Sequence, residues 1–207
     1  MRSTGFNSFV AVAALAAAVV LAGAARAGAL EDGLAAYQAG RFDEAAAVWM
    51  PVAAAGDADA QTYIGFLYSE GQGVAEDDTE AVRWFLLAAA QGDLDAAMRL
   101  GLHYSRGEGV PEDDAEGVRW FRYAAERGKS EAQLSLAIHY DSGEGVTADP
   151  SQAYAWAKVA AAQGNWQAAR FQMVLEDTAE TAAILRGNEL AQRYWENHVL
   201  PFLNPAN

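Results

Sequence analysis

The 207-residue chain contains no cysteine, and it has only five prolines. Without cysteine, thiol catalysis, thiolate zinc sites and a disulfide framework are excluded. The composition is rich in alanine, with 52% hydrophobic and 20% charged residues. This balance favours helices and excludes both a collagen-like chain and a disordered chain of low hydrophobicity.

Basic side chains are also scarce. The sequence has 14 Lys and Arg against 28 Asp and Glu, which gives a net charge of −14. Binding to phosphate backbones requires clustered Lys and Arg, and docking on anionic lipid requires a basic face. We therefore expect neither a nucleic acid nor an anionic membrane surface as a partner.

The N-terminal segment has the pattern of a secretory signal peptide. A short polar stretch, residues 1–7, precedes an uninterrupted run of apolar and small residues over 9–25, and an A-x-A cleavage pattern ends at Ala27. The run is short for a membrane span. We predict that residues 1–27 are a signal peptide cleaved after Ala27; the alternative is an uncleaved N-terminal anchor.

This segment also indicates where the protein acts. Ala24 stands where a lipoprotein signal would have cysteine, so we predict no lipid anchor. Cleavage would leave 12 basic against 28 acidic residues, a net charge of −16. We expect a periplasmic or secreted protein that has no membrane insertion after cleavage.

One unit of 36 residues repeats along the rest of the chain. Small, aromatic and glycine positions recur in register. The recurring columns are Ala60, Ala96, Ala132 and Ala168; Tyr68, Tyr104 and Tyr140; Gly73, Gly109 and Gly145; and Trp84, Trp120 and Trp156. Repeats of this length are typical of stacked supersecondary units.

Each unit is predicted to form two helices. Ala60, Ile64 and Tyr68 share one helical face, and the glycines at 71 and 73 interrupt that helix. Asp77 followed by Glu80 has the form of a capping box that begins the second helix. In the last unit, Asp149-Pro150 places an N-cap residue directly before a proline at the first helical position.

The pattern A-x-x-x-[IL]-G-x-x-Y-x-x-G-x-G-V-x-x-D, followed by A-x-x-W-x-x-x-A-A-x-x-G, closely resembles the Sel1-like repeat, a relative of the tetratricopeptide repeat. The resemblance implies an all-α fold, an α-solenoid of helix-turn-helix repeats in a right-handed superhelix, with protein binding as its usual work. The departures are Gly117 for an Ala, Ala137 for a Gly and Ala157 for a Phe.

On this basis we divide residues 28–198 into a solenoid with two caps. A shortened unit at 30–56 is the N-terminal cap. The repeats are 60–95, 96–131 and 132–167, and 168–198 is the C-terminal helical cap, followed by a tail at 199–207. Caps are expected because a single repeat cannot bury its apolar faces alone. We place Trp84, Trp120 and Trp156 in the core, and within the C-terminal cap we expect Phe171, Val174, Leu175, Ile184, Leu190 and Trp195 to pack.

Catalytic and metal-binding patterns are weak. His103 and His139 occupy one repeat column but lack a third histidine or a ring of carboxylates, so we interpret them as polar flanking positions and predict no metal and no cofactor. Some cysteine-rich Sel1-like proteins are linked to β-lactam hydrolysis. Because this chain has no S-x-x-K motif and no paired cysteines, we predict that it is not an enzyme; a hydrolase of β-lactam or peptidoglycan-like substrates is the alternative of a different class.

The helical wheel of the first helices suggests a binding surface. Positions 62 and 66 point away from Ala60 and Ile64, toward the side that lines the concave groove in the related tetratricopeptide fold. This groove would carry an apolar stripe with two arginines at its centre. The predicted partner-binding residues are Thr62, Tyr63, Phe66, Met98, Arg99, Leu102, Arg106, Leu134 and Ile138. Packing between adjacent first helices could equally explain the stripe.

These observations favour an exported scaffold or adaptor that binds a protein or peptide partner from the envelope or the secreted fraction. A periplasmic regulator of a membrane sensor is a second hypothesis within the same class.

Overall fold

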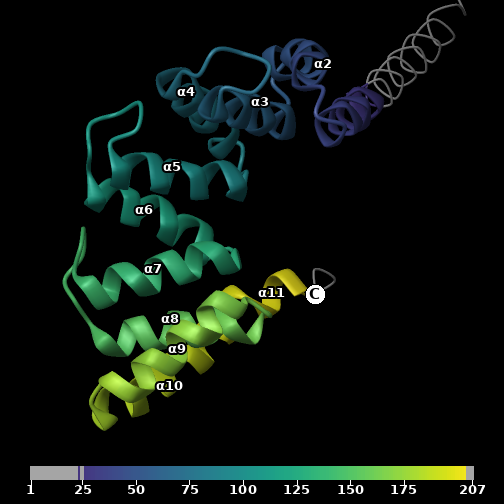
Figure 1. Ribbon diagram of the computed structural model, residues 1–207. Coiled ribbons are helices and arrows are strands. Elements are labelled where there is room, and N and C mark those ends of the chain that lie inside the picture. Colours follow the sequence, from purple (N-terminus) through teal and green to yellow (C-terminus); the bar gives the residue numbers. More distant parts are fainter. Residues whose placement is uncertain (1–22, 24–25, 204–207) are drawn as a thin grey trace, which may run out of the picture.

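The computed structural model describes residue 23 and residues 26–203, and every regular element within them is a helix. Residues 26–38 are helical, and the chain then forms ten further helices. These are α2 (Phe42–Ala54), α3 (Ala58–Glu70), α4 (Asp78–Ala89), α5 (Leu94–Arg106), α6 (Asp114–Ala125), α7 (Ser130–Ser142), α8 (Pro150–Ala162), α9 (Trp166–Thr178), α10 (Thr181–His198) and α11 (Leu200–Leu203). Successive helices pack as hairpins and stack into an open arc (Figure 1). This arrangement confirms the predicted all-α solenoid.

The predicted helix boundaries follow from local capping. The side chain of Asp77 accepts a hydrogen bond from Glu80 N at 3.1 Å, and Asp113 accepts one from Glu116 N at 2.9 Å. Asp149 caps α8, with Pro150 as its first helical residue. Each such N-cap contributes about 1 kcal/mol by satisfying a backbone N–H that the helix leaves free. The helix starts could therefore be predicted from single residues.

The loop inside each repeat rests on the preceding unit. A Cβ built on Gly109 would lie 2.3 Å from the carbonyl group of Asp78, at the N-terminus of α4, and Gly109 has a φ of 71°. Only glycine tolerates both the left-handed backbone and this close approach. The glycine column thus fixes the spacing between successive repeats.

A phenylalanine and a glycine form the contact between the two helices of a repeat. Phe121 of α6 is fully buried and lies over Gly101 of α5, where a Cβ would come within 2.4 Å of the ring. Phe85 lies over Gly65 in the preceding repeat in the same way, at 2.5 Å. The third repeat has alanine at both positions, so the smaller side chain on α8 leaves space for a methyl group on α7.

The two histidines of the repeat column connect neighbouring repeats. His103 is 2% exposed; its Nδ1 donates to the Glu108 carbonyl at 3.0 Å, and its Nε2 accepts from Ser69 Oγ at 3.4 Å. His139 repeats the contact with the preceding repeat, its Nε2 lying 3.5 Å from Ser105 Oγ, but its Nδ1 donates to the Ser135 carbonyl of its own helix at 2.8 Å. The interpretation of these residues as flanking positions is therefore wrong for His103, which is buried between α3 and α5.

The three tryptophans of the repeat column differ in how deeply they are buried. Trp84 is 7% exposed and packs with the N-terminal cap, and Trp156 is 4% exposed beneath Tyr194 of α10, with ring centroids 4.3 Å apart. Trp120 in the central repeat is only half-buried. The prediction that all three are core residues holds only in part for Trp120, which packs against the core but is half-buried, whereas the N-terminal cap covers Trp84 and α10 covers Trp156.

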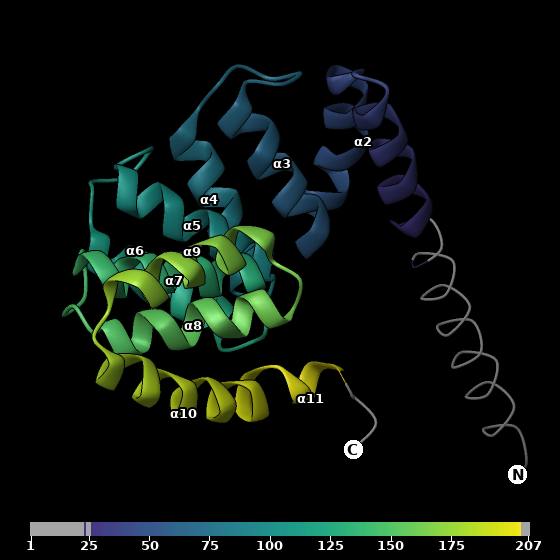
Figure 2. The same ribbon diagram turned by 60° about the horizontal axis from the view of Figure 1, so that its bottom comes forward.

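The C-terminal cap covers the solenoid in an unexpected way. After α9, the chain turns back and α10 packs along α8, with α9 on another side of α8 (Figure 2). Leu175 is buried, but Val174 is 55% exposed, which contradicts its predicted place in the packed cap. The predicted tail also begins differently, because Val199 is 1% exposed and Leu200–Leu203 form α11.

Candidate binding groove

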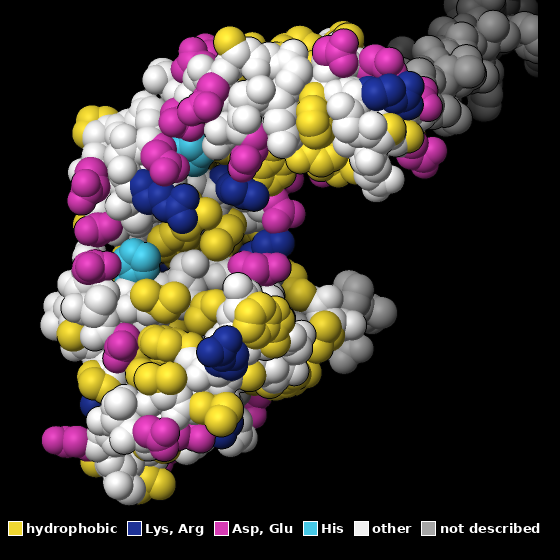
Figure 3. All heavy atoms as spheres, viewed as in Figure 1, with side chains coloured by type: hydrophobic (Ala, Val, Ile, Leu, Met, Phe, Trp, Pro, Cys, Tyr) yellow, Lys and Arg dark blue, Asp and Glu magenta, His cyan; other side chains and the backbone are white. Residues whose placement is uncertain are grey.

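Two adjoining cavities lie where α3 meets its neighbours. The first, of about 380 Å³, is formed by the N-terminal cap, α3 and one residue of α5. The second, of about 220 Å³, is formed by α3, α5 and the loops beside them. Glu70 and Arg99 line both. We call the two cavities together the inner groove; Figure 3 shows hydrophobic and basic side chains gathered on the inner side of the arc around α5.

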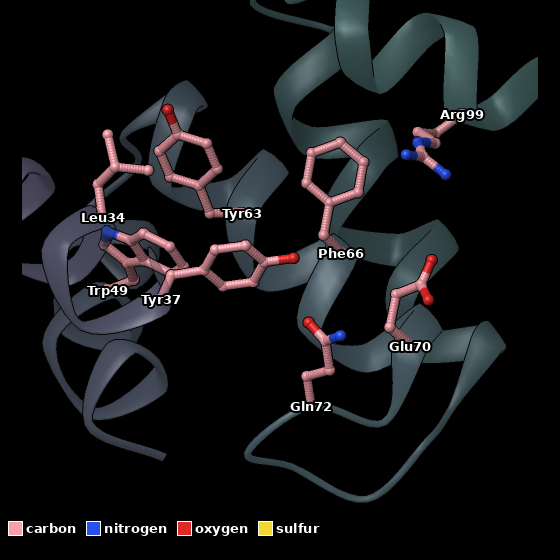
Figure 4. Close-up of a pocket in the computed structure, with 8 residues that line it drawn as sticks. All are labelled: Leu34, Tyr37, Trp49, Tyr63, Phe66, Glu70, Gln72 and Arg99. Carbon is pink, nitrogen blue, oxygen red and sulfur yellow. The ribbon is translucent and has the colours of Figure 1, made fainter. Parts of the chain in front are cut away.

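The first cavity has aromatic walls. Trp49 of α2 forms its buried floor, with 1% of its surface exposed, and stacks on Tyr63 with ring centroids 4.6 Å apart. Tyr37 lies 5.9 Å from the Trp49 ring. Figure 4 shows these rings and Phe66 around one hollow, with Gln72, Glu70 and Arg99 on its far side. The cavity is thus apolar inside and polar at one rim.

Arg99 is held at this rim by an aromatic ring. Its guanidinium carbon lies 4.5 Å from the centroid of Phe66, and Phe66 in turn packs edge-on against Phe85 with ring centroids 5.5 Å apart. An arginine over an aromatic face gains about 0.5–1 kcal/mol when exposed. Among the described residues, no ion pair or hydrogen bond of Arg99 is found. The guanidinium donors at this rim are therefore oriented and available.

The second cavity is polar and carries charges of both signs. Leu102 forms its apolar part, and Arg106 lies 3.8 Å from Glu108 Oε1, with 60% of its side chain exposed. Asp78, Glu70 and Glu76 also line it. An exposed ion pair of this kind contributes little to stability, about 0–1 kcal/mol, so Arg106 can exchange its partner at small cost.

The surroundings of Tyr63 are negatively charged. Burial raises the pKa of the Tyr63 hydroxyl, and the charges of Asp59, Asp93 and Asp95 raise it further. Tyr63 is therefore a neutral hydrogen-bond donor at any physiological pH. The acidic surroundings make Arg99 the cation that stands out in the first cavity.

The structure brings together five of the nine predicted binding residues. Tyr63, Phe66 and Arg99 line the first cavity, and Arg99, Leu102 and Arg106 line the second. The other four do not line either cavity: Met98 and Leu134 are half-buried, Ile138 is 43% exposed, and Thr62 is 3% exposed.

Thr62 is the clearest discrepancy. The helical wheel placed it on the open side of α3, opposite Ala60 and Ile64. In the structure α3 is contacted by α2, α4 and α5, so that packing covers more than one side of the helix. Thr62 is consequently buried and is not available to a partner, and we omit it from the binding surface.

Residues of the N-terminal cap were missed as candidates. Leu34, Tyr37 and Trp49 line the first cavity, although their unit was predicted only to be an end cap. The density of aromatic residues at 37, 42 and 49 was the available signal.

Metal binding, membrane spanning and a further cavity are the other features that bear on function. Within 26–203, no group of three or more His, Asp or Glu side chains is arranged to hold a metal ion. None of the helices in the same range has the length and apolar character to cross a membrane. A separate cavity of about 570 Å³ lies between α8 and α10, beside Val159, Ala191 and Trp195, far along the chain from the predicted residues. The predicted signal peptide falls mainly outside the described residues.

The fold and its repeated hairpins define the class of protein: an α-solenoid built from helix-turn-helix units. Three consecutive segments, residues 58–93, 94–129 and 130–165, match the family model of the Sel1 repeat. The chain therefore belongs to the Sel1 repeat family. The matched segments have the predicted period of 36 residues and begin two residues earlier than the predicted units. Proteins of this fold commonly serve as protein-interaction scaffolds.

Two solved structures are similar to this chain. One is c5321, a protective antigen present in uropathogenic Escherichia coli strains, with a TM-score of 0.70, 32% identity, and coverage of 74% of this chain and 33% of that one. The other is a Sel1 repeat protein from Oxalobacter formigenes, with a TM-score of 0.61, 29% identity, and coverage of 73% of this chain and 46% of that one. The chain thus spans less than half the length of either protein. The comparison with curated proteins gave no match.

Proposed function

We propose that this protein is an exported interaction scaffold that binds another envelope or secreted protein through its inner groove. The observation that carries the proposal is that the two cavities share Glu70 and Arg99 as lining residues. Along α3 and α5, the apolar first cavity is followed by the guanidinium of Arg99 and then by the polar second cavity. A flexible peptide of a partner protein fits this groove better than a small substrate does, because the groove is open and has separate apolar and charged parts.

The charges support an acidic segment as the bound part of the partner. Arg99 and Arg106 are seven residues apart on α5, in a chain whose net charge is −14. Arginine binds carboxylates through two parallel hydrogen bonds. In this proposal, the peptide places apolar side chains against Phe66 and Leu102 while its carboxylates meet the two arginines.

Export is the second part of the proposal and rests on the sequence alone. Cleavage after Ala27 would remove Arg26, whose side chain pairs with the buried carboxylate of Asp57. Asp57 keeps its hydrogen bond from Ala60 N at 2.7 Å, so α3 retains its N-cap after cleavage. Intact-mass measurement of the protein purified from the periplasm should give a chain that begins at Gly28. A membrane-bound form that retains residues 1–27 would refute cleavage, and a full-length protein found only in the cytoplasm would refute export.

The binding surface is tested with one combined variant. Arg99→Glu, Leu102→Asp and Arg106→Glu together reverse both charges and place a carboxylate in the apolar part of the groove. Affinity capture from periplasmic extract, with mass spectrometry, should identify a protein that the native chain retains and the variant does not. The matched control reverses Arg119 and Arg170, two exposed arginines that line neither cavity. Equal capture by the triple variant and the native chain would move the binding surface elsewhere.

A further inference from the structure

We infer that the first cavity is an anchor pocket for a single aromatic side chain that carries a carboxylate next to it. This inference rests on the proposed function, since it names the part of a partner peptide that the groove recognises. It concerns residues of the N-terminal cap, where sequence analysis placed no site.

The shape and lining of the cavity select a planar apolar group. Trp49 and Tyr63 are stacked on each other and line the hollow, with Trp49 as its buried floor, while Tyr37 and Phe66 are half-buried and also line it (Figure 4). The volume of about 380 Å³ lies at the lower end of the range for ligand cavities, which suits one side chain and not a drug-sized ligand. Rings prefer edge-to-face and offset contacts with other rings, and each such pair adds about 0.5–1.5 kcal/mol to burial.

The rim carries two opposite charges, and the arginine is the stronger determinant. Arg99 is half-buried, and Phe66 holds its guanidinium in place. Glu70 is the exposed last residue of α3, so water and salt screen its carboxylate more effectively. An oriented, partly buried cation gains more from a partner than an exposed carboxylate does, because less side-chain entropy is lost. The pocket therefore favours an anion beside the ring.

Small molecules that model one residue of a peptide can test this inference. N-acetylphenylalanine has the ring and a carboxylate, N-acetylphenylalaninamide has the ring alone, and phenylalaninamide has the ring and an ammonium group. Each is titrated into the ¹⁵N-labelled protein, with the indole N–H signal of Trp49 as the readout. This group hydrogen-bonds to the Leu30 carbonyl at 3.3 Å behind the cavity, so a ring entering the pocket should shift its resonance.

The expected order of affinity follows from the rim charges. N-acetylphenylalanine should bind with a dissociation constant of about 1 mM, as expected for a ligand of its size. The neutral amide should bind about five- to tenfold more weakly, because it lacks a charge-assisted hydrogen bond. Phenylalaninamide should bind weakest. Tightest binding by phenylalaninamide would show that Glu70 dominates and would overturn the inference, as would the absence of saturable shifts at about 20 mM, well above that expected constant.

Two variants assign the effect to the pocket. Arg99→Gln should remove the preference for the carboxylate while the amide binds unchanged, and Arg99→Lys should retain part of it. Leu34→Asp places a charge on an exposed position that lines the hollow and should abolish binding of both ligands; the control is Ala35→Asp, on the next residue, which is exposed and does not line the cavity. Unchanged binding in Leu34→Asp would place the ligands outside this pocket.

Failure of the anchor can be distinguished from failure of the proposed function. If the triple variant loses a captured protein but the native chain binds none of the three small molecules, the scaffold function stands and the anchor pocket is wrong. If the pocket binds N-acetylphenylalanine but no captured protein depends on the inner groove, the cavity is a small-molecule site and the proposed function is wrong.

Discussion

The contact between Phe121 and Gly101 makes a quantitative prediction about the repeat core. Phe121 is fully buried, so Phe121→Ala removes a complete ring and leaves a cavity; the expected loss is about 3–5 kcal/mol of unfolding free energy. Gly101→Ala introduces a methyl group 2.4 Å from the same ring. The helix gains about 1 kcal/mol from the propensity of alanine, but overpacking costs about 1–3 kcal/mol, so a net loss of about 1 kcal/mol is expected.

The double variant should lose less unfolding free energy than the two single variants lose in sum. With the ring gone, the methyl group at position 101 occupies part of the cavity and the gain in helix propensity is realised. The double variant then costs about 2–4 kcal/mol, which leaves a favourable coupling of at least about 1 kcal/mol. It reproduces the pair of alanines that the third repeat has at 137 and 157, both fully buried.

Equilibrium unfolding in urea, followed by far-ultraviolet circular dichroism, measures all four proteins of this cycle. A coupling within about 0.5 kcal/mol of zero would mean that the two sites act independently. That result would refute the assignment of the glycine column to contact with the phenylalanine ring.

Three further predictions concern the loops, the tryptophans and the half-buried carboxyl group of Asp93. Gly109→Ala should lower the unfolding free energy by about 2 kcal/mol or more, because the new methyl group meets the backbone of Asp78. Gly92 also has a positive φ, but no atom lies within 4 Å of its Cβ, so Gly92→Ala should cost only the backbone strain. Equal losses of the two variants in urea unfolding would refute the loop contact. Trp156→Ala should cost about 3–5 kcal/mol and Trp120→Ala clearly less, because Trp120 is half-buried; chemical denaturation that gives the reverse order would contradict the structure. Burial raises the pKa of Asp93, so the folded state holds this proton more tightly than the unfolded state, and the native chain should gain stability relative to Asp93→Asn as pH falls from about 7 to about 4. A pH series of thermal unfolding in which this difference stays constant would show that the Asp93 carboxyl has an ordinary pKa.

Local chemistry made the repeats predictable from the sequence. The aspartates at 77, 113 and 149 determine where second helices begin, and the glycines at 71, 107 and 143 end the first helices in a left-handed conformation. These signals act over three or four residues, so a single chain contains all the information. The family resemblance then supplied the order in which the hairpins stack.

The surroundings of a repeated residue were not predictable in the same way. Trp120 and Trp156 occupy the same column, yet α10 covers only Trp156. Thr62 occupies an apparently open face of α3, yet neighbouring helices bury it. Burial depends on how other helices pack around a residue, and a helical wheel contains no information about how many of its sides have neighbours. The aromatic cavity was missed for the same reason, because it forms only where the cap meets α3.

The central claim is that a partner protein lies in the inner groove, and site-specific photocrosslinking tests it most directly. A benzophenone amino acid is placed at Glu76, which is exposed and lines the second cavity, and separately at Arg119, which is exposed on α6 and lines neither cavity. After irradiation of intact cells, position 76 should give a crosslink to a distinct protein that is absent from position 119 and that the Arg99→Glu and Leu102→Asp changes abolish. Crosslinks from position 119 alone, or crosslinks from position 76 that survive both changes, would contradict the account.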